Sequence, residues 1–309
     1  MRVYSAAEVH DALAWEPLAQ AIRSAFARGA SVPLRHAHAL AEADTLLLMP
    51  AWDDRHAITK IVTVIPGAPH TVQASVVLLD RASGDPLAFI EGESLTVRRT
   101  AATSAMVART LARADASRLL VVGSGRLAAW MARAHAALRP GLTQVELWAR
   151  RPEAAASLAA TLLGEGLPAR AVADLPAAVS AAHIVCCATT ASEPVVRGEW
   201  LAPGVHLDLV GAFRPSMREV DDAAVQRAHL VVDTYAGALA EAGDLVQPMR
   251  AGLIGREQVA AELGELWRDE ASERRLGRRD DSTITLFKSV GTAIEDLAAA
   301  ELVYESLRR

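Results

Sequence analysis

The stretch Leu119-Leu-Val-Val-Gly-Ser-Gly-Arg-Leu-Ala128 decides the fold of this chain. Its four apolar residues predict a buried strand, and the glycines that follow let the backbone turn sharply into a helix. Gly123 permits the tight turn, and Gly125 lets backbone amides approach a diphosphate group at the helix N-terminus. Ala128 is small enough for the helix to pack closely on the strand. The stretch therefore predicts the start of a dinucleotide-binding fold.

Alternating strands and helices follow this turn. The helix Arg126–Leu138 and the strand Val145–Trp148 complete a βαβ unit. The expected strands are 119–123, 144–149, 168–172, 183–188, 205–210 and 229–233, with helices between them. A capping box, Ser216-Met-Arg-Glu219, predicts the start of one of these helices. Such alternation is typical of a parallel, doubly wound sheet, so we expect a Rossmann-type domain over residues 115–289.

The segment before residue 93 has a different pattern. A capping box, Ser5-Ala-Ala-Glu8, opens a helix that is broken near Trp15 and ends at Gly29. The expected strands are 45–49, 57–65, 74–80 and 87–91. Because hairpins join antiparallel neighbours, this segment predicts an antiparallel sheet.

Two further helices flank the central region. A long helix, Ser94–Ala114, leads out of the N-terminal segment, and the strand Ile284–Phe287 precedes an Ala-rich helix, Gly291–Leu307, which we expect to return to the first domain. The predicted fold class is therefore α/β, with a discontinuous α+β domain (1–114 plus 290–309) beside the Rossmann-type domain (115–289).

The composition narrows the class of protein. The chain has 309 residues, enough for two domains, and 51% of them are hydrophobic. A net charge of -5 without a basic cluster argues against a nucleic-acid partner. The N-terminus lacks the apolar run of a signal peptide, and no apolar run is long enough for a bilayer. We therefore expect a cytoplasmic protein with no membrane partner.

Lys60 is the most unusual charge in the N-terminal half. It lies in the strand Ile58–Ile65 and shares a face with Ile58, Val62 and Val64. A buried lysine costs several kcal/mol unless it meets an anion, which favours contact with a ligand. The alternative is an edge strand, on which the ammonium would extend to water.

Arg99 raises the same question on the helix from Ser94. Its face also holds Leu95, Ala102 and Met106, whereas Arg98, Arg109 and Arg113 lie elsewhere and are expected in solvent. A guanidinium on an apolar stripe suits a carboxylate ligand, and a structural salt bridge is the alternative.

The segment Pro33-Leu-Arg-His-Ala-His38 precedes the expected sheet, and the residues alone place Arg35 in a loop. His36 and His38 could suggest a metal site. Since no third ligand occurs at a suitable spacing, we expect no metal.

The end of the second Rossmann strand indicates the type of cofactor. NAD enzymes usually place an acidic residue there, which binds the ribose 2′-hydroxyl. This strand ends Leu147-Trp-Ala-Arg-Arg151, with Ala149 at the acidic position. Arg150 and Arg151 favour a 2′-phosphate and hence NADPH, with NADH possible. The alternative is a pair of surface arginines ahead of a helix.

Several segments together resemble the ornithine cyclodeaminase/μ-crystallin family over nearly the whole chain. The segments are 46–50 (LLLMP), 58–60 (ITK), 95–102 (LTVRRTAA), the Gly123 turn, 211–219 (GAFRPSMRE), 241–244 (EAGD) and 287–296 (FKSVGTAIED). The resemblance implies a homodimer. It also implies that the N-terminal domain, completed by the C-terminal helix, builds the dimer interface and the substrate site beside the NAD(P)-binding domain.

The resemblance also assigns roles by position. Arg35, Lys60 and Arg99 correspond to three cations that hold the α-carboxylate of a substrate. Thr189, Thr190 and Val290 correspond to residues that line the nicotinamide site, and Val290 is also expected to bind the substrate. The remaining expected cofactor positions are Thr100, Gly123, Ser124, Gly125, Arg126, Leu127, Ala149, Arg150, Arg151, Val210 and Gly211.

One departure from the family pattern changes the expected reaction. Cyclodeaminases of the family carry a catalytic aspartate in Gly-Gly-Asp-x-Pro, where this chain has Phe213. A phenyl ring cannot accept a proton or activate water. The sequence instead resembles the ketimine-reductase branch, which reduces Δ1-pyrroline-2-carboxylate and Δ1-piperideine-2-carboxylate with NADPH. In that case Phe213 lies against the substrate ring, and Lys60 keeps the imine nitrogen protonated.

Other functions stay open at this point. They are an alanine dehydrogenase, an acyclic imine reductase, an ornithine cyclodeaminase or hydroxyproline dehydratase, and a binding protein that holds NADPH and a small carboxylate without turnover. The residues do not choose between a five- and a six-membered ring in the substrate.

Overall fold

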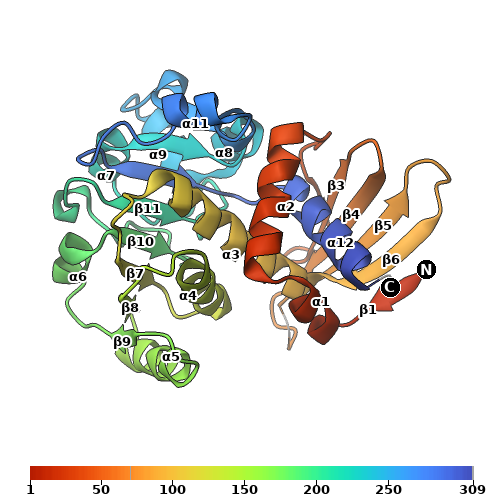
Figure 1. Cartoon of the computed structure of the whole chain (residues 1–309), viewed down its shortest axis with the longest axis horizontal. Helices are drawn as coiled ribbons and strands as arrows, with labels where there is room; N and C mark the ends of the chain where they lie inside the picture. Colours follow the sequence, from red (N-terminus) through yellow and green to blue (C-terminus); the bar gives the residue numbers. More distant parts are fainter. Residues whose placement is uncertain (70, 308–309) are drawn as a thin grey trace. The chain divides into compact units, whose positions relative to one another are not determined.

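The computed structural model describes residues 1–69 and 71–307. The chain divides into two compact units, of which the first comprises residues 1–103 with the C-terminal segment from 292, and the second residues 104–291 (Figure 1). The boundary at 103/104 lies inside one long helix, α3 (Gly92–Leu111). This is the helix predicted at Ser94–Ala114, and it begins two residues and ends three residues earlier than predicted.

The first unit is built on a six-stranded sheet in the order β1-β6-β5-β4-β3-β2. Its strands are β1 (Arg2–Tyr4), β2 (His36–Ala39), β3 (Thr45–Trp52), β4 (His56–Val64), β5 (Val72–Asp80) and β6 (Pro86–Glu91). The strands from β2 to β6 are antiparallel, as predicted. The sheet as a whole is mixed, because β1 pairs with β6 in parallel. The sequence analysis missed both β1 and β2, which are short edge strands.

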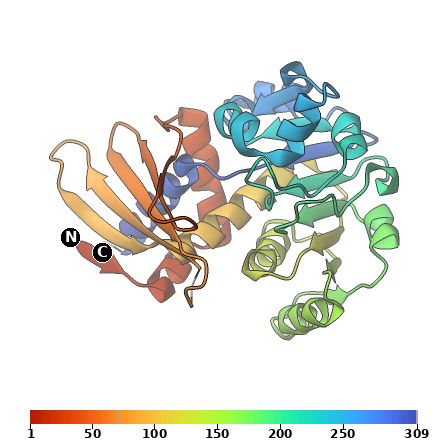
Figure 2. The same cartoon turned by 180° about the vertical axis from the view of Figure 1, so that it is seen from behind.

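Three helices belong wholly to this unit: α1 (Ala6–Ala12), α2 (Trp15–Arg28) and α12 (Ala293–Leu307). The Ser5–Glu8 capping box is confirmed, and Gly29 ends α2 with a φ of 81°. The return of the last helix is also confirmed, since α12 packs against α2 and on β3, β4 and β5. Figures 1 and 2 show α2 and α12 on one face of the sheet. Among the described residues of this unit, no helix covers the opposite face.

The second unit contains an eight-stranded sheet in the order β13-β12-β14-β11-β10-β7-β8-β9, and every pairing is parallel. Its strands are β7 (Arg118–Val122), β8 (Gln144–Trp148), β9 (Ala169–Ala171), β10 (Ile184–Cys187), β11 (His206–Leu209), β12 (His229–Val232), β13 (Val259–Glu262) and β14 (Thr285–Lys288). The doubly wound parallel sheet is confirmed, and β13 is a strand that the sequence analysis did not predict.

Helices connect these parallel strands. They are α4 (Arg126–Leu138), α5 (Pro152–Gly164), α6 (Leu175–Ala181), α7 (Asp222–Arg227), α8 (Tyr235–Glu241), α9 (Gly243–Arg250), α10 (Leu263–Leu266) and α11 (Glu270–Leu276). From β7 the chain builds the sheet first toward β9 and then, through β10, toward β13. The carboxyl ends of β7, β8 and β10 thus surround the point where the strand order reverses, and ligands of such sheets bind there.

The capping box predicted at Ser216–Glu219 is wrong. The next helix, α7, begins at Asp222 and is capped by Asp221, whose carboxylate accepts from Ala224 N. The Glu219 carboxylate instead accepts from Thr189 N, at 2.7 Å, and from Gly211 N, at 2.8 Å. A tertiary partner replaces the local cap, because Glu219 is fully buried beside these loops.

Candidate active site

The glycine turn after β7 has the geometry that the sequence predicts. Gly123 has a φ of 134°, and a Cβ there would lie 2.6 Å from Ala188 O, so only glycine fits. Gly125 is the N-cap of α4 and makes no side-chain cap, and a Cβ on Gly125 would meet nothing within 4 Å. Space is therefore free beside Gly125 at the start of α4, which fits a diphosphate at the helix N-terminus.

A cleft of about 370 Å³ opens at this turn. It is lined by Gly123, Ser124, Gly125, Trp148, Ala149, Arg150, Arg151, Ala188, Thr189, Thr190, Ala191, Ser192 and Val195. The structure thus brings together the glycine turn, the residues that follow β8 and the residues that follow β10. Arg126 and Leu127 lie in the first turn of α4, directly after Gly125. The lining fits a dinucleotide, and of its members Trp148, Ala188, Ala191, Ser192 and Val195 were not predicted.

Four other predicted residues follow the central strands of this unit. Gly211 comes after β11, and a Cβ there would lie 2.0 Å from Thr189 O, so the Val210–Gly211 segment lies against the loop that contains Thr189. Val290 follows β14 and is buried, and its N–H donates to Asp233 Oδ2 at 2.7 Å. Phe213 is 39% exposed. Asp233 was missed by the sequence analysis, although an acid at the end of a buried strand is the signal that marks it.

A buried group of charges, here called the Lys288 cluster, joins these loops. It consists of Lys288, Glu219 and Asp244, all with 0% exposure. Lys288 Nζ lies 3.1 Å from Asp244 Oδ2 and 4.0 Å from Glu219 Oε2. Asp244 also accepts from Glu219 N at 2.7 Å. Burial raises the pKa of the Glu219 carboxyl, and the charge of Lys288 opposes that shift. The cluster therefore ties β14 and α9 to the loops after β10 and β11.

In the first unit, Lys60 and Arg99 meet on one carboxylate. Lys60 Nζ lies 2.7 Å from Asp296 Oδ2, and Arg99 Nε donates to Asp296 Oδ1 at 2.9 Å. Arg99 Nη1 donates to Glu295 Oε2 at 2.6 Å. We call these four residues the Lys60 cluster. All are buried, and the two acids lie in the first turn of α12, where the helix dipole favours negative charge.

The structure excludes one of the two alternatives that the sequence left for Lys60. β4 is an interior strand, so the edge-strand alternative is wrong. Burial lowers the pKa of Lys60 to about 8, since the ammonium loses water and also faces Arg99 and Arg35, against the attraction of Asp296. Burial disfavours the charged Asp296 carboxylate, but Arg99 and Lys60 outweigh this and lower its pKa.

The other predicted cations of this unit have different surroundings. Arg35 immediately precedes β2, is half-buried and lies close enough to Lys60 to lower its pKa. The prediction of a solvent-exposed Arg98 is wrong, because its guanidinium stacks 3.9 Å from the Trp15 ring and donates to Leu13 O. The end of α1 and the start of α2 thus lie against that side of α3. Thr100 lies on α3 and is half-buried.

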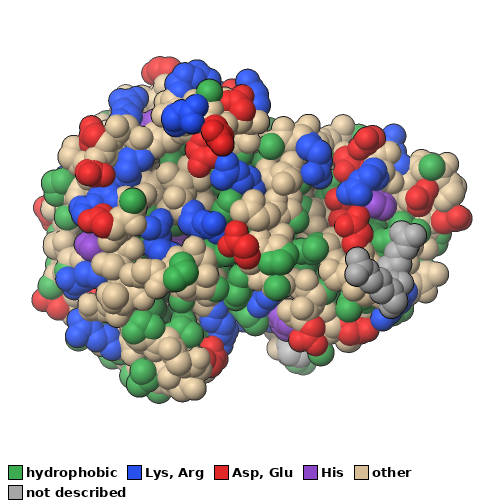
Figure 3. All heavy atoms as spheres, viewed as in Figure 1, with side chains coloured by type: hydrophobic (Ala, Val, Ile, Leu, Met, Phe, Trp, Pro, Cys, Tyr) green, Lys and Arg blue, Asp and Glu red, His purple; other side chains and the backbone are tan. Residues whose placement is uncertain are grey.

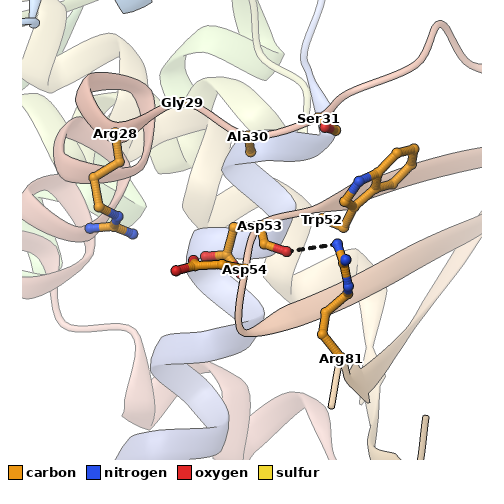
Figure 4. A pocket seen from close by; sticks show the side chains of 8 residues that line it. All are labelled: Arg28, Gly29, Ala30, Ser31, Trp52, Asp53, Asp54 and Arg81. Atoms are coloured by element: carbon orange, nitrogen blue, oxygen red, sulfur yellow. Dashed lines mark hydrogen bonds between the residues drawn. The ribbon is translucent and has the colours of Figure 1, made fainter. Parts of the chain in front are cut away.

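A second cleft, of about 660 Å³, is also found in the first unit (Figure 4). Its lining comes from the end of α2, the β3–β4 turn and the turn after β5, and it includes Arg28, Trp52, Asp53 and Arg81. Arg81 Nη1 donates to Asp53 O at 2.9 Å, as Figure 4 shows. Its lining residues differ from those predicted to bind substrate, and its arginines are exposed.

Two groups of described side chains come close enough to share a metal ion. They are His135, Cys186 and Asp208 in the second unit, and Asp53, His56 and Glu301 in the first. Each contains a direct hydrogen bond, His135 Nε2 with Asp208 Oδ2 at 3.0 Å and His56 Nδ1 with Glu301 Oε1 at 2.6 Å. These bonds account for both groups without an ion. His36 and His38 are exposed on β2 and belong to neither.

The outer surface carries charges of both signs. On the face shown in Figure 3, basic and acidic side chains are interspersed over both units. In the described part of the chain, no helix has both the length and the apolar character needed to cross a membrane.

Comparisons with known proteins agree with this geometry. A Delta(1)-pyrroline-2-carboxylate reductase of Colwellia psychrerythraea is 34% identical over 319 residues, which cover 99% of each chain. The structure of Thermococcus litoralis Delta(1)-pyrroline-2-carboxylate reductase, in complex with NADH and L-proline, matches with a TM-score of 0.91 at 32% identity and covers 99% of this chain and 97% of that one. An archaeal alanine dehydrogenase dimer with bound NAD matches with a TM-score of 0.90 at 29% identity, covering 98% and 95%.

The family resemblance inferred from the sequence motifs is confirmed. The model of the ornithine cyclodeaminase/mu-crystallin family matches residues 1–309. The chain belongs to the ornithine cyclodeaminase/mu-crystallin family.

Proposed function

We propose that this member of the family, an NAD(P)H-dependent imine oxidoreductase, reduces the cyclic ketimines Δ1-pyrroline-2-carboxylate or Δ1-piperideine-2-carboxylate to L-proline or L-pipecolate. The observation that carries the proposal is the pair of buried cations, Lys60 and Arg99, fixed on Asp296. The names of the relatives from Colwellia psychrerythraea and Thermococcus litoralis support the same substrate class.

The cations hold the α-carboxylate of the substrate. The Lys60 ammonium and the Arg99 guanidinium each carry more N–H groups than their bonds to Asp296 and Glu295 use. Arg35 adds a third positive charge beside Lys60. A carboxylate bound between fixed cations places the C=N carbon in one position, and much of the rate then comes from holding the reactants in that position.

The residues of the second unit hold the cofactor. The turn from Gly123 to Gly125 binds the diphosphate, and Thr189, Thr190 and Val290 contact the nicotinamide. When bound, the reduced nicotinamide supplies the hydride that the C=N carbon accepts. Lys60 keeps a proton close to the imine nitrogen, which makes the imine a better hydride acceptor. Phe213 offers an apolar surface to the ring of the substrate and cannot take a proton from an amine.

NADPH is the proposed cofactor. Ala149 leaves the position after β8 without the acid that would repel a 2′-phosphate, and Arg150 and Arg151 lie in the lining of the same cleft. NADH is the alternative, because it is the nucleotide in the Thermococcus litoralis complex.

The two parts of the chain divide these tasks. Residues 1–114 with 290–309 serve as the substrate-binding and dimerisation domain, and residues 115–289 bind the cofactor. The face of the six-stranded sheet opposite Lys60 carries apolar residues, among them Leu48 opposite Ile61 and Val77 opposite Phe89. A homodimer that buries this face would shield it from water. The archaeal alanine dehydrogenase is described as a dimer.

A substrate panel tests the proposal. NADPH absorbance at fixed enzyme concentration is followed with the five-membered and the six-membered cyclic imino acid. We expect turnover of at least one ring, with a higher kcat/KM than for pyruvate with ammonia. Greater activity with pyruvate, ammonia and NADH would favour the second candidate, an alanine dehydrogenase, which the match to the archaeal enzyme supports. NADPH-free conversion of ornithine would contradict the proposal.

A further inference from the structure

The two neighbouring acids of the Lys60 cluster have different partners. Asp296 touches both cations, with Oδ2 2.7 Å from Lys60 Nζ and Oδ1 2.9 Å from Arg99 Nε. Glu295 has an ion pair with Arg99 at 2.6 Å. We propose that Asp296 is a positioning residue that holds the Lys60 ammonium in place and preserves its charge, whereas Glu295 holds Arg99. The inference rests on the proposed function, in which a charged Lys60 binds the substrate.

The surroundings of Lys60 explain why its charge depends on Asp296. β4 is an interior strand, and its neighbours opposite Lys60 are Met49 on β3 and Val76 on β5, which cannot titrate. Among the described residues, the charged groups that act most strongly on Lys60 are Asp296 on α12, Arg99 on α3 and Arg35 before β2. Two of these three repel an ammonium. Asp296 is therefore the group that offsets burial and both arginines.

The charge of Asp296 sets the pH at which Lys60 loses its proton. With Asp296 in place, burial and the two arginines lower the pKa of Lys60 to about 8. Removing the negative charge of Asp296 lowers that pKa further, so Lys60 loses its proton at a lower pH. Arg99 keeps its charge throughout this range. Removing Glu295 therefore changes how Arg99 is held and leaves the titration of Lys60 in place.

The test compares Asp296→Asn with its neighbour Glu295→Gln, two acid-to-amide changes in the same turn of α12. For both variants and the wild type, kcat/KM for a cyclic imino acid with NADPH is measured from pH 5.5 to pH 9.5. The titration of the substrate itself is common to all three proteins and cancels in the comparison.

In the wild type, kcat/KM should fall as the pH rises through about 8. For Asp296→Asn we expect this fall at a pH lower by at least about one unit, so that the loss of activity relative to wild type grows about tenfold between pH 6 and pH 8.5. Glu295→Gln should reduce kcat/KM by a similar factor at every pH. The inference would be overturned if kcat/KM of Asp296→Asn fell at the same pH as in the wild type. It would also be overturned if Glu295→Gln moved this fall to lower pH as far as Asp296→Asn does.

A third variant decides the question if Asp296→Asn does not fold, as judged by circular dichroism. Lys60→Arg keeps a cation opposite Asp296 but cannot lose its proton in this range. The fall near pH 8 should then disappear, and its persistence would show that Lys60 does not set it. A wild type that reduces no cyclic imine would instead refute the proposed function, which separates the two failures.

Discussion

The Lys60 cluster and the Lys288 cluster contain the same kinds of charged groups in different proportions, two cations with two carboxylates in the first and one cation with two carboxylates in the second. In the first, Lys60 and Arg99 share Asp296, and Glu295 adds a second acid for Arg99. In the second, one lysine faces two carboxylates. The carboxylates of the Lys288 cluster bind backbone amides, since Glu219 accepts from Thr189, Gly211 and Ala212.

This difference explains what each cluster can do. In the Lys288 cluster, backbone amides of several loops donate to both carboxylates, and the two carboxylates outnumber the single cation, so we expect this cluster to hold the loops together. The cations of the Lys60 cluster keep N–H groups beyond those that bind the acids, so it can also take an anion. Burial of charge alone thus does not mark a ligand site.

The largest expected effect is on stability, in Lys288→Met. This change leaves Glu219 and Asp244 buried without the cation they share, and we expect a loss of about 3–5 kcal/mol in the free energy of unfolding. Lys60→Met leaves Asp296 paired with Arg99 and should cost only about 1–3 kcal/mol. Urea unfolding followed by circular dichroism measures both. If Lys60→Met lost more free energy of unfolding than Lys288→Met, the Lys60 cluster and not the Lys288 cluster would contribute more to stability.

Arg99→Ala should affect activity most strongly among variants that fold. Loss of charge-assisted hydrogen bonds to a carboxylate is worth about 1.5–3 kcal/mol, or roughly a ten- to hundredfold fall in kcat/KM for the cyclic imino acid. Arg109→Ala, an exposed change on the same helix, is the matched control and should leave kcat/KM within twofold. If Arg99→Ala retains wild-type kcat/KM, Arg99 does not bind the substrate.

Glu219→Gln should act on the cofactor and leave substrate binding alone. The amide keeps one acceptor for Thr189 but presents N–H groups to the amides of Gly211 and Ala212, so the loops move apart. A lost hydrogen bond is worth about 1 kcal/mol, and we expect the Kd for NADPH to rise about fivefold. Fluorescence titration measures this, with the exposed Glu199→Gln as control. An unchanged Kd would mean that the cluster stabilises the fold without shaping the cleft.

The smallest expected effect concerns the nucleotide. Arg150 and Arg151 are exposed, and exposed ion pairs contribute about 0.2–1 kcal/mol. Their joint replacement by alanine should raise the KM for NADPH about threefold and leave the KM for NADH unchanged. Equal changes for both nucleotides would remove these arginines from recognition of a 2′-phosphate.

The sequence predicted the second unit better than the first. The glycine turn, the parallel strands other than β13 and most residues of the cleft could be predicted from local patterns, because apolar runs followed by glycines are typical of a βαβ unit. In the first unit the edge strands β1 and β2 escaped detection. Both are short, and each is held by pairing with a neighbour rather than by an apolar pattern of its own.

Tertiary partners decided the remaining differences. The spacing of Ser216 and Glu219 suits a helix cap, but a buried carboxylate forms the bonds that its surroundings offer, which here are amides of distant loops. Arg98 lies on a side of α3 that helical periodicity separates from Arg99. Only the packing of α1 and α2 shows that this side is also covered.

The sequence by itself determined that Lys60 and Arg99 each lie on an apolar face of their element, where a charge needs an anion if it is buried. Only the tertiary structure decided which anion, because Asp296 comes from the other end of the chain and reaches them when α12 packs on the sheet. Periodicity is a property of neighbouring residues. Pairing of charges depends on which elements meet, and that is settled by the packing of the whole unit.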